Sequence, residues 1–340
     1  MIVEGTVLVG REFEPIEGRV IIEDGTIDTI EERAVPTDDI VLPAFVNAHT
    51  HIGDSIAKEA GAGLSLTELV APPDGLKHRL LADASYDETV AAIKRSLQFM
   101  HSTGTVAFLD FREGGVEGVE MLREAADGQA ITPIILGRET PAAMELADGF
   151  GASSARDGEY SQKRHATREA GKLFGIHAGE RDSGDINGAF DLEPDFLVHM
   201  VHPEPIHLDR LADRETPVVV CPRSNLVTDS GVPPIAELCE RTRVALGTDN
   251  VMLNSPSMFR EMEFAAKLSD VSAKTVLRMA TYNGAELAGL NCGLIEEGRD
   301  AAVLVLDGDS DNLVGAQNPV RAVVRRAGHG DVKRVHYPYG

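Results

Sequence analysis

Residues 42–51 read LPAFVNAHTH, an apolar run that leads directly into two histidines separated by one residue. Side chains alternate between the faces of a β-strand, so His49 and His51 are expected to project from one face at its C-terminal end. Two imidazoles held side by side on a rigid element provide half of a site for zinc, iron or a similar divalent metal. A lone His-x-His pair is weak evidence, so this interpretation depends on partners elsewhere in the chain.

Three later apolar runs end in side chains that suit the same site. They are followed by His177, by His199 and by Asp249, and Glu180 lies three residues beyond His177. Polar residues at the C-terminal ends of several strands are typical of a TIM barrel, whose strand ends all meet at one face. The pattern therefore predicts an α/β fold, a (β/α)8 TIM barrel with a metal site at that face.

The two ends of the chain differ from its middle. Residues 1–42 and 293–340 carry short β-patterned runs, among them residues 320–324 and a hairpin signal at Asp24-Gly25. Neither piece is long enough to bury a stable core alone, so we expect them to pair as one small β-sandwich domain.

Between these ends, in residues 43–292, β-patterned and helical segments alternate as a barrel requires. The eight barrel strands are expected to end near His49, Phe111, Gly137, Ala152, His177, His199, Pro222 and Thr248. Helices are expected over residues 87–101, 116–126, 205–214 and 272–287. The long first loop, residues 52–86, contains Pro72-Pro73 and is suited to an active-site lid.

Composition limits the partners. The formal net charge is −23, from 55 acidic and 32 basic residues, and such a surface repels nucleic acid and anionic membranes. It also resembles the acidity of halophile proteins, so we expect a halophilic source. Three cysteines without metal-type spacing, no signal segment at the start and no apolar run of about 20 residues indicate a soluble cytoplasmic protein with a small-molecule substrate. A homo-oligomer is left open.

Five motifs in order, PAFVNAHTH, GIHAGE, FLVHMVH, VVVCPRSNL and VALGTDN, resemble the amidohydrolase superfamily, specifically its mononuclear deaminase branch. That branch includes cytosine deaminases and the deaminases of S-adenosylhomocysteine and methylthioadenosine. The resemblance covers nearly the whole chain, and it is much more specific for the superfamily than for a substrate.

The resemblance implies a role for each motif residue. The implied metal ligands are His49, His51, His177 and Asp249. Glu180 occupies the position that shuttles a proton to the ring nitrogen, and His199 the position that orients the hydrolytic water. The dinuclear branch carries a bridging lysine at the end of strand four, and residues 145–160 contain no lysine. We therefore expect one divalent metal per chain, with zinc favoured over iron.

The same roles follow from chemistry. Water attacking an aromatic amidine carbon needs activation, and bound zinc lowers the pKa of water from 15.7 to roughly 7. Asp249 can take the proton of that water, and Glu180 can protonate the ring nitrogen, a type of catalysis that contributes roughly 10²–10⁴-fold. The prediction is a hydrolytic deaminase of a purine, a pyrimidine or a related heterocycle, acting through metal-activated hydroxide.

Each assignment has a structural alternative. A strand-end histidine could be satisfied by backbone carbonyls, Asp249 could cap a loop, and Glu180 could pair with Arg181. His202 competes with His199 for the same role. Two alternative functions also remain, an amidohydrolase that cleaves a cyclic amide or expels a leaving group other than ammonia, and a metal-free binding or scaffold protein.

Other polar residues carry weaker signals. Ser224 and Asn225 could face the pocket or fix a loop, and Asp54, Lys77 and His78 in the first loop are candidates for contact with the substrate. Three further histidines are expected to be cap or surface groups, namely His101, His165 and His207.

Overall fold

The computed structural model of the protein describes residues 1–70 and 74–338. The Pro72-Pro73 pair expected in the first loop lies outside these residues. Within them, no helix combines the length and the apolar content that crossing a bilayer requires.

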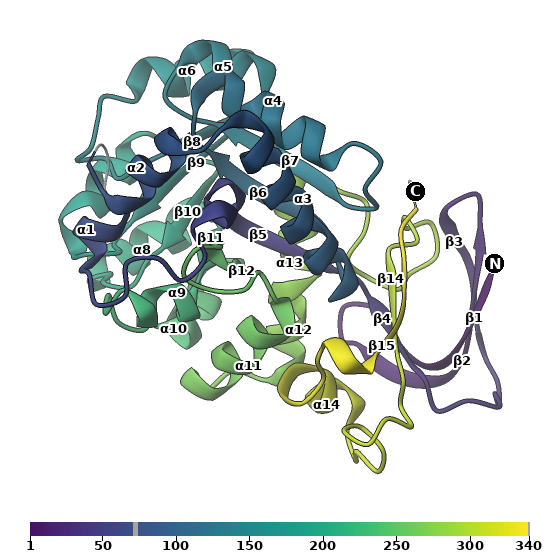
Figure 1. Ribbon diagram of the computed structural model, residues 1–340. Helices are drawn as coiled ribbons and strands as arrows, with labels where there is room; N and C mark the ends of the chain where they lie inside the picture. The colour runs from purple at the N-terminus through teal and green to yellow at the C-terminus, as the bar shows by residue number, and fades with distance from the viewer. Residues whose placement is uncertain (71–73, 339–340) are drawn as a thin grey trace.

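A curled parallel sheet of nine strands forms the larger body of the molecule (Figure 1). The order across the sheet is β12-β11-β10-β9-β8-β7-β6-β5-β13. The two edge strands, β12 and β13, are separated by only Gly247 and Thr248 in the chain, and β13 pairs with β5. The sheet therefore closes on itself as a TIM-like barrel, and all its strands end on the same face.

The strand bounds agree with the expected ends within a few residues. They are β5 (Phe45–His51), β6 (Thr105–Arg112), β7 (Thr132–Gly137), β8 (Gly149–Ala152), β9 (Leu173–Ala178), β10 (Phe196–His199), β11 (Val218–Val220), β12 (Val244–Leu246) and β13 (Asp249–Asn250). Strand β8, whose four residues are all buried, occupies the fourth place, where the sequence signal is weakest.

Helices connect these strands and cover the outside of the barrel (Figure 1). Short helices follow β5: η1 (Ile52–Ala57), α1 (Leu66–Val70) and α2 (Leu76–Asp83). The remaining barrel helices are α3 (Tyr86–Ser102), α4 (Gly115–Ala126), α5 (Pro141–Leu146), α6 (Ser161–Glu169), η2 (Ser183–Asp185), α7 (Ile186–Asp191), α8 (Pro205–Arg214), α9 (Pro222–Val227), α10 (Ile235–Arg241), α11 (Met258–Leu268), α12 (Ala273–Ala280) and α13 (Tyr282–Ala288). Helix α3 begins with a capping box between Ser85 and Glu88, which satisfies backbone donors at its first turn.

The helix expected over residues 272–287 is two helices, and this is a correction. Thr281 has φ −129° and ψ −92°, outside the helical region, and separates α12 from α13. Its hydroxyl donates to the carbonyl of Leu277, so the chain ends one helix and starts the next at this residue.

Both ends of the chain meet in a second sheet, as expected. Its order is β15-β14-β4-β1-β2-β3, and β4 from the N-terminal part pairs with β14 from the C-terminal part. The strands are β1 (Ile2–Val9), β2 (Glu14–Glu23), β3 (Thr26–Glu32), β4 (Ile40–Pro43), β14 (Val303–Leu306) and β15 (Val332–His336). A sandwich is not confirmed, because these six strands are hydrogen-bonded into one sheet.

The β run expected at residues 320–324 is wrong. These residues lie in helix α14 (Pro319–Arg325), which precedes the turn η3 (His329–Asp331) and contacts α11 and α12 of the barrel. Asn318 caps α14 by accepting from the backbone N–H of Arg321, and Pro319 occupies the first helical position. These start signals outweigh the β propensity of the valines.

Candidate functional site

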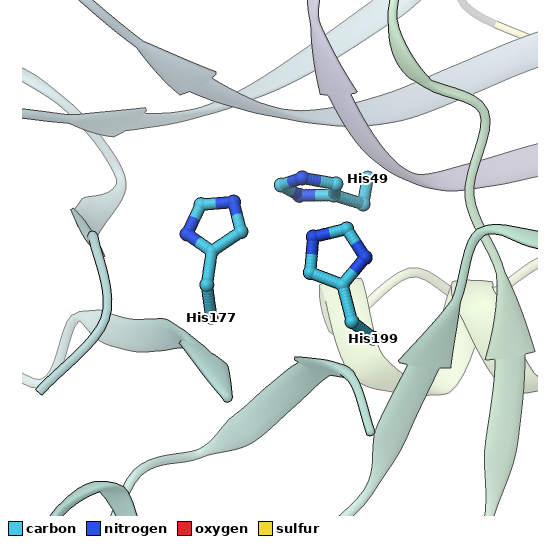
Figure 2. Close-up of side chains that lie close together, drawn as sticks. All are labelled: His49, His177 and His199. Carbon is cyan, nitrogen blue, oxygen red and sulfur yellow. The ribbon is translucent and has the colours of Figure 1, made fainter. Parts of the chain in front are cut away.

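The predicted metal-binding and catalytic residues converge at the C-terminal face of the barrel. His49 and His51 come from β5, His177 from β9, His199 from β10 and Asp249 from β13. Figure 2 shows the rings of His49, His177 and His199 gathered in one space, with ring centroids 5.1–6.1 Å apart. The possible ligand atoms form three overlapping groups, each within 4.8 Å: His49, His177 and His199; His49, His51 and Asp249; Glu180, His199 and Asp249.

The hydrogen bonds of His51 and His177 determine which ring nitrogen is available. Nδ1 of His51 lies 3.1 Å from the carbonyl oxygen of Phe111, and Nδ1 of His177 lies 2.8 Å from that of Ala152. Each Nδ1 therefore carries the proton, and each Nε2 presents a lone pair. The two Nε2 atoms face each other at 3.3 Å. Two lone pairs repel at this distance unless a cation lies beside them. In a tetrahedral zinc site with bonds of about 2.0–2.1 Å, neighbouring ligand atoms are also about 3.3 Å apart.

The surroundings of His49 are the clearest indication that the cluster suits a cation. Its side chain is 0% exposed, and neither ring nitrogen has a hydrogen-bond partner. Nε2 nevertheless lies 3.3 Å from Oδ1 of Asp249. Buried polar atoms are normally satisfied, so an orphaned imidazole beside a carboxylate fits a cation ligand.

Burial keeps these imidazoles in the form that binds metals. Burial lowers the pKa of His49. Burial and the charge of Lys77 lower the pKa of His51 to about 3. Burial and the neighbouring His49 lower the pKa of His177 well below its usual value. All three are therefore neutral near pH 7. Burial opposes ionisation of Asp249, but the His49 contact and the neighbouring histidines hold its pKa well below the usual value.

Asp249 is oriented by the segment that follows β11. Its Oδ2 accepts a hydrogen bond of 2.5 Å from the hydroxyl of Ser224, while Oδ1 faces His49 and lies 3.6 Å from Nε2 of His51. Asp249 has φ +58°, a left-handed conformation that costs free energy in a residue other than glycine. Strain of this kind is common at functional sites.

His199 and Glu180 form a second pair beside the first cluster. Nε2 of His199 lies 3.6 Å from Oε2 of Glu180, and its Nδ1 lies 3.1 Å from Nδ2 of Asn225. Burial is the main cause that raises the pKa of Glu180, with a contribution from the Asp249 charge. A raised pKa lets this carboxyl carry a proton near neutral pH. His202, the competitor for this role, is exposed.

Sequence reasoning missed Glu113, which lies directly behind the cluster. Its Oε1 is 2.7 Å from Nδ1 of His51 and accepts from the Lys77 ammonium at 2.6 Å and from Arg138 at 3.0 Å. Burial would raise its pKa, but Lys77, His51 and Arg138 together hold the pKa well below the usual value. Glu113 follows β6 immediately, so a carboxylate just after a strand end was the available signal.

The floor of the site is the ring of Phe111. Its centroid lies 4.6 Å from that of His49 and 5.0 Å from that of His177. Gly151 and Gly175 make room for it, because a Cβ at either position would lie 2.6–2.7 Å from the ring. A rigid apolar floor limits the motion of the imidazoles above it.

A pocket opens over this cluster. It has a volume of about 80 Å³, enough for several water-sized groups. Its walls include residues from the first loop and from the loops after β7, β8 and β9: Leu66, Val70, Lys77, Arg138, Arg156, Arg181 and Asp185. The cluster itself supplies His51, His177, Glu180, His199 and Asp249. Of the three candidates from the first loop, Lys77 lines this pocket.

The other weak candidates have structural contacts. Asp54 is buried and accepts from the side chain of Asn250 and from the backbone of Met252, and His78 contacts the carbonyl of Val70. The ring of His207 takes part in the capping box of α8 with Glu204, as expected for a cap.

Several known proteins resemble this chain in sequence. The sequence profile described as "Amidohydrolase family" matches residues 40–181 and 185–335. A putative aminohydrolase of Methanothermobacter thermautotrophicus is 36% identical, over 89% of this chain and 90% of the relative. A 5-methylthioadenosine/S-adenosylhomocysteine deaminase of Haloarcula marismortui is 28% identical, over 96% of this chain and 86% of the relative.

Solved structures share the fold. The zinc-bound adenosine deaminase of Xanthomonas campestris superimposes with a TM-score of 0.81 at 18% identity, over 99% of this chain and 91% of that one. The archaeal relatives include halophiles and other species, so they do not support the expected halophilic source.

Proposed function

Because this chain belongs to the amidohydrolase family, we propose that it is a metal-dependent hydrolytic deaminase of an aminated heterocycle, a purine, a pyrimidine or a related ring. Family and deaminase relatives together make it a hydrolase of carbon–nitrogen bonds other than peptide bonds. The observation that carries the finer proposal is the cluster of imidazoles around the ionised carboxylate of Asp249, with Glu180 beside them. The rings of His49, His51 and His177 in this cluster are neutral near pH 7.

The proposed metal ligands are His49, His51, His177 and Asp249. The orphaned nitrogens of His49 and the facing Nε2 atoms of His51 and His177 support this set. We propose zinc, since nitrogen and carboxylate oxygen donors at tetrahedral spacing suit it. When bound, such a metal supplies a nucleophile at neutral pH by lowering the pKa of water from 15.7 to about 7.

Glu180 is proposed to move protons to the substrate. Its raised pKa allows it to donate a proton to the ring nitrogen as water adds to the neighbouring carbon, which prevents a high-energy anion from forming. His199, within 3.6 Å of Glu180, is proposed to orient the water, with Asn225 holding the ring. Oδ1 of Asp249 faces the imidazoles and is proposed to take the first proton of the water.

The test of the function is ammonia release from a panel of aminated purines, pyrimidines and pterins, together with elemental analysis of the purified protein. We expect turnover of at least one member and about one zinc per chain. His49→Ala should remove both metal and activity. Hydrolysis without ammonia would favour another amidohydrolase reaction, and a metal-free protein without activity would favour a scaffold.

Glu180→Gln separates catalysis from metal binding. The variant keeps the shape of the side chain and leaves all four proposed ligands in place, so metal content should stay near that of wild type. Turnover should fall by roughly 10²–10⁴-fold, the usual loss of a general acid–base group. A Glu180→Gln enzyme with normal kcat would refute the proposed role of this residue.

A further inference from the structure

A buried ion pair lies beside the cluster and takes no part in the chemistry proposed for it. Arg223 belongs to the motif VVVCPRSNL, and Glu261 comes from α11. Nε of Arg223 donates to Oε2 of Glu261 at 2.6 Å, and the two residues are 5% and 0% exposed. Neither residue lines the pocket over the cluster. Burying an ion pair removes the solvation of both charges, so stability alone does not explain this pair.

The carboxylate of Glu261 also fixes the first turn of α9. Its Oε1 accepts from the backbone N–H of Arg223 at 3.0 Å, and donors in the first turn of a helix have no acceptor within that helix. Cys221, the residue before the helix, provides no side-chain cap. Glu261 therefore supplies the missing acceptor from a neighbouring helix, and it holds both the backbone and the side chain of Arg223.

The next two residues of this turn contact two groups of the reaction centre. Ser224 donates to Oδ2 of Asp249 at 2.5 Å, and Nδ2 of Asn225 lies 3.1 Å from Nδ1 of His199. Ser224 and Asn225 are both 0% exposed. Because these two residues are adjacent in one helix, a shift of the turn would change both contacts together. The position of α9 therefore sets the orientation of Asp249 and of His199.

Arg223 also joins α9 to the chain that follows Asp249. Its Nη2 donates to the carbonyl of Ser255 at 2.7 Å, in the segment between Asp249 and α11. Asp249 is thus restrained by α9 through its own side chain, and the segment that leads away from it is bound to the same helix. Asp249 has a left-handed φ of +58°, and strain of this kind persists only where the surrounding structure over-determines the conformation. These two restraints meet that need.

We propose that Glu261 is a positioning residue that acts through Arg223 and the first turn of α9. By holding this turn, Glu261 keeps Asp249 in place as a metal ligand and keeps His199 oriented toward Glu180. The inference rests on the proposed function for the roles of Asp249 and His199, and on the contacts of α9 for the coupling between them.

Zinc affinity tests the inference without turnover. Glu261→Gln keeps the shape of the side chain but removes the charge that holds Arg223. Chelator competition should then show zinc affinity reduced by roughly 10- to 100-fold, the usual loss when an outer contact of a metal ligand is removed. The visible absorption of the cobalt-loaded variant should also differ from that of wild type, because these bands report the geometry of the ligands. Wild-type affinity with a wild-type spectrum would overturn the inference.

The matched control is Asp195→Asn, at the opposite end of the barrel. Asp195 precedes β10 and accepts from the backbone N–H of Phe174 at 2.7 Å and from Nη1 of Arg164 at 2.9 Å. It therefore also joins two elements through one carboxylate. Asp195→Asn should lower the free energy of unfolding and leave zinc affinity unchanged. An equal fall of zinc affinity in both variants would indicate a general loss of stability and would overturn the inference.

A double-mutant cycle shows whether Glu261 acts through α9. Ser224→Ala removes the hydrogen bond to Asp249, so adding Glu261→Gln to it should lower zinc affinity much less than Glu261→Gln does alone. Losses of affinity that add would overturn the path through Ser224.

The pair Arg223→Met and Glu261→Leu covers the case in which Glu261→Gln does not fold. Apolar residues of similar size often replace a buried ion pair without loss of stability, but leucine provides no acceptor for the backbone N–H at position 223. We expect this double variant to fold and to bind zinc about tenfold or more weakly than wild type. A stable double variant with wild-type zinc affinity would overturn the inference.

Turnover then separates positioning from substrate binding. With a heterocycle that releases ammonia, Glu261→Gln should lower kcat by about tenfold or more, because misplaced reacting groups slow the chemical step. KM should stay near that of wild type, since Glu261 does not line the pocket. An unchanged kcat would overturn the inference.

These measurements also distinguish this inference from the proposed function. If the protein binds zinc but deaminates no heterocycle of the panel, the proposed activity fails, while the zinc affinities still decide on Glu261. A wild-type protein that binds no metal would refute the proposed ligands and this inference with them.

Discussion

At the scale of single residues, the cluster is organised by what lies behind the imidazoles. His51 and His177 each use Nδ1 on a protein acceptor, so Nε2 is fixed toward the centre. Glu113 adds a carboxylate 2.7 Å from Nδ1 of His51, and carboxylates in this position increase the basicity of a ligand histidine.

Glu113→Gln should therefore weaken zinc binding. Removing an outer carboxylate from a histidine ligand typically costs 10- to 100-fold in affinity, and we expect a loss in that range. Zinc affinity is measured by competition with a chelator. The matched control is Glu117→Gln, on the exposed side of α4. Unchanged affinity in Glu113→Gln would mean that the backbone carbonyl of Phe111 alone orients His51.

Asp54→Asn should change how stability depends on pH. Burial raises the pKa of Asp54 to about 7, above about 3.9 in the unfolded chain. The folded state then binds more protons between these values, so the stability contributed by Asp54 is complete below pH 4 and is lost as pH rises through 7. Relative to Asp54→Asn, wild type should lose up to about 1.4 kcal/mol per pH unit across this window. Urea unfolding of both proteins at several pH values measures this loss. Free energies of unfolding that change equally with pH in the two proteins would contradict the prediction.

The site residues that sequence could predict are those whose neighbours in the chain identify them. His49 and His51 follow an apolar run, and so do His177 and His199. Glu113 and Arg138 also follow strand ends, but nothing local shows that they meet across the barrel. Their contact with Lys77 depends on where the first loop folds, which is a tertiary property.

At the scale of elements, close packing beneath the site depends on glycines in the strands. A Cβ at Gly175 would lie 2.3 Å from Cζ of Phe196 and 2.7 Å from Cζ of Phe111. Real Cβ contacts are never so short, so the two rings would have to move. Phe111 contacts His49 and His177, and its displacement would reach the proposed ligands.

Gly175→Ala should accordingly destabilise the fold by about 1–3 kcal/mol, the usual cost of overpacking a core. It should also lower zinc affinity, whereas a purely local effect would leave affinity unchanged. Urea unfolding and chelator competition on the same preparation provide both values. Gly330→Ala is the control, since a Cβ there meets nothing within 4 Å.

The sequence predicts a helix or strand correctly where the local preference of its residues agrees with the way the element packs in the fold. Helix α8 has the expected bounds because Pro205 starts it and its apolar face is periodic. Residues 320–324 form a helix although three of the five are valines, which favour a strand. Asn318 and Pro319 start this helix, and it packs on α11 and α12. The break at Thr281 has no proline to indicate it, and the nearby Gly284 lies within α13 rather than at the break.

At the scale of the whole molecule, the dominant property is the net charge of −23. Carboxylates crowded on a compact surface repel one another, and folding brings them closer together than they are in the unfolded chain.

Added salt should therefore stabilise the protein. Ions screen these repulsions over about 30 Å at 0.01 M and about 3 Å at 1 M, so the Tm should rise with potassium chloride over this range. Scanning calorimetry of the zinc-loaded protein measures the trend. An equal Tm at low and at high salt would mean that the acidic charges are too far apart to destabilise the fold.

The barrel closes where β5 meets β13, and this closure, here called the seam, affects the order of folding. Asn47 and Thr248 are hydrogen-bonded across it at 2.7 Å although 201 residues separate them in the chain. Contacts of such long sequence separation close the largest loops and are slow to form. The proposed ligands His51 and Asp249 stand on opposite sides of this seam. A metal bound by both residues would stabilise the pairing of β5 with β13, which forms late in folding. Removal of the metal should therefore accelerate unfolding far more than it slows refolding.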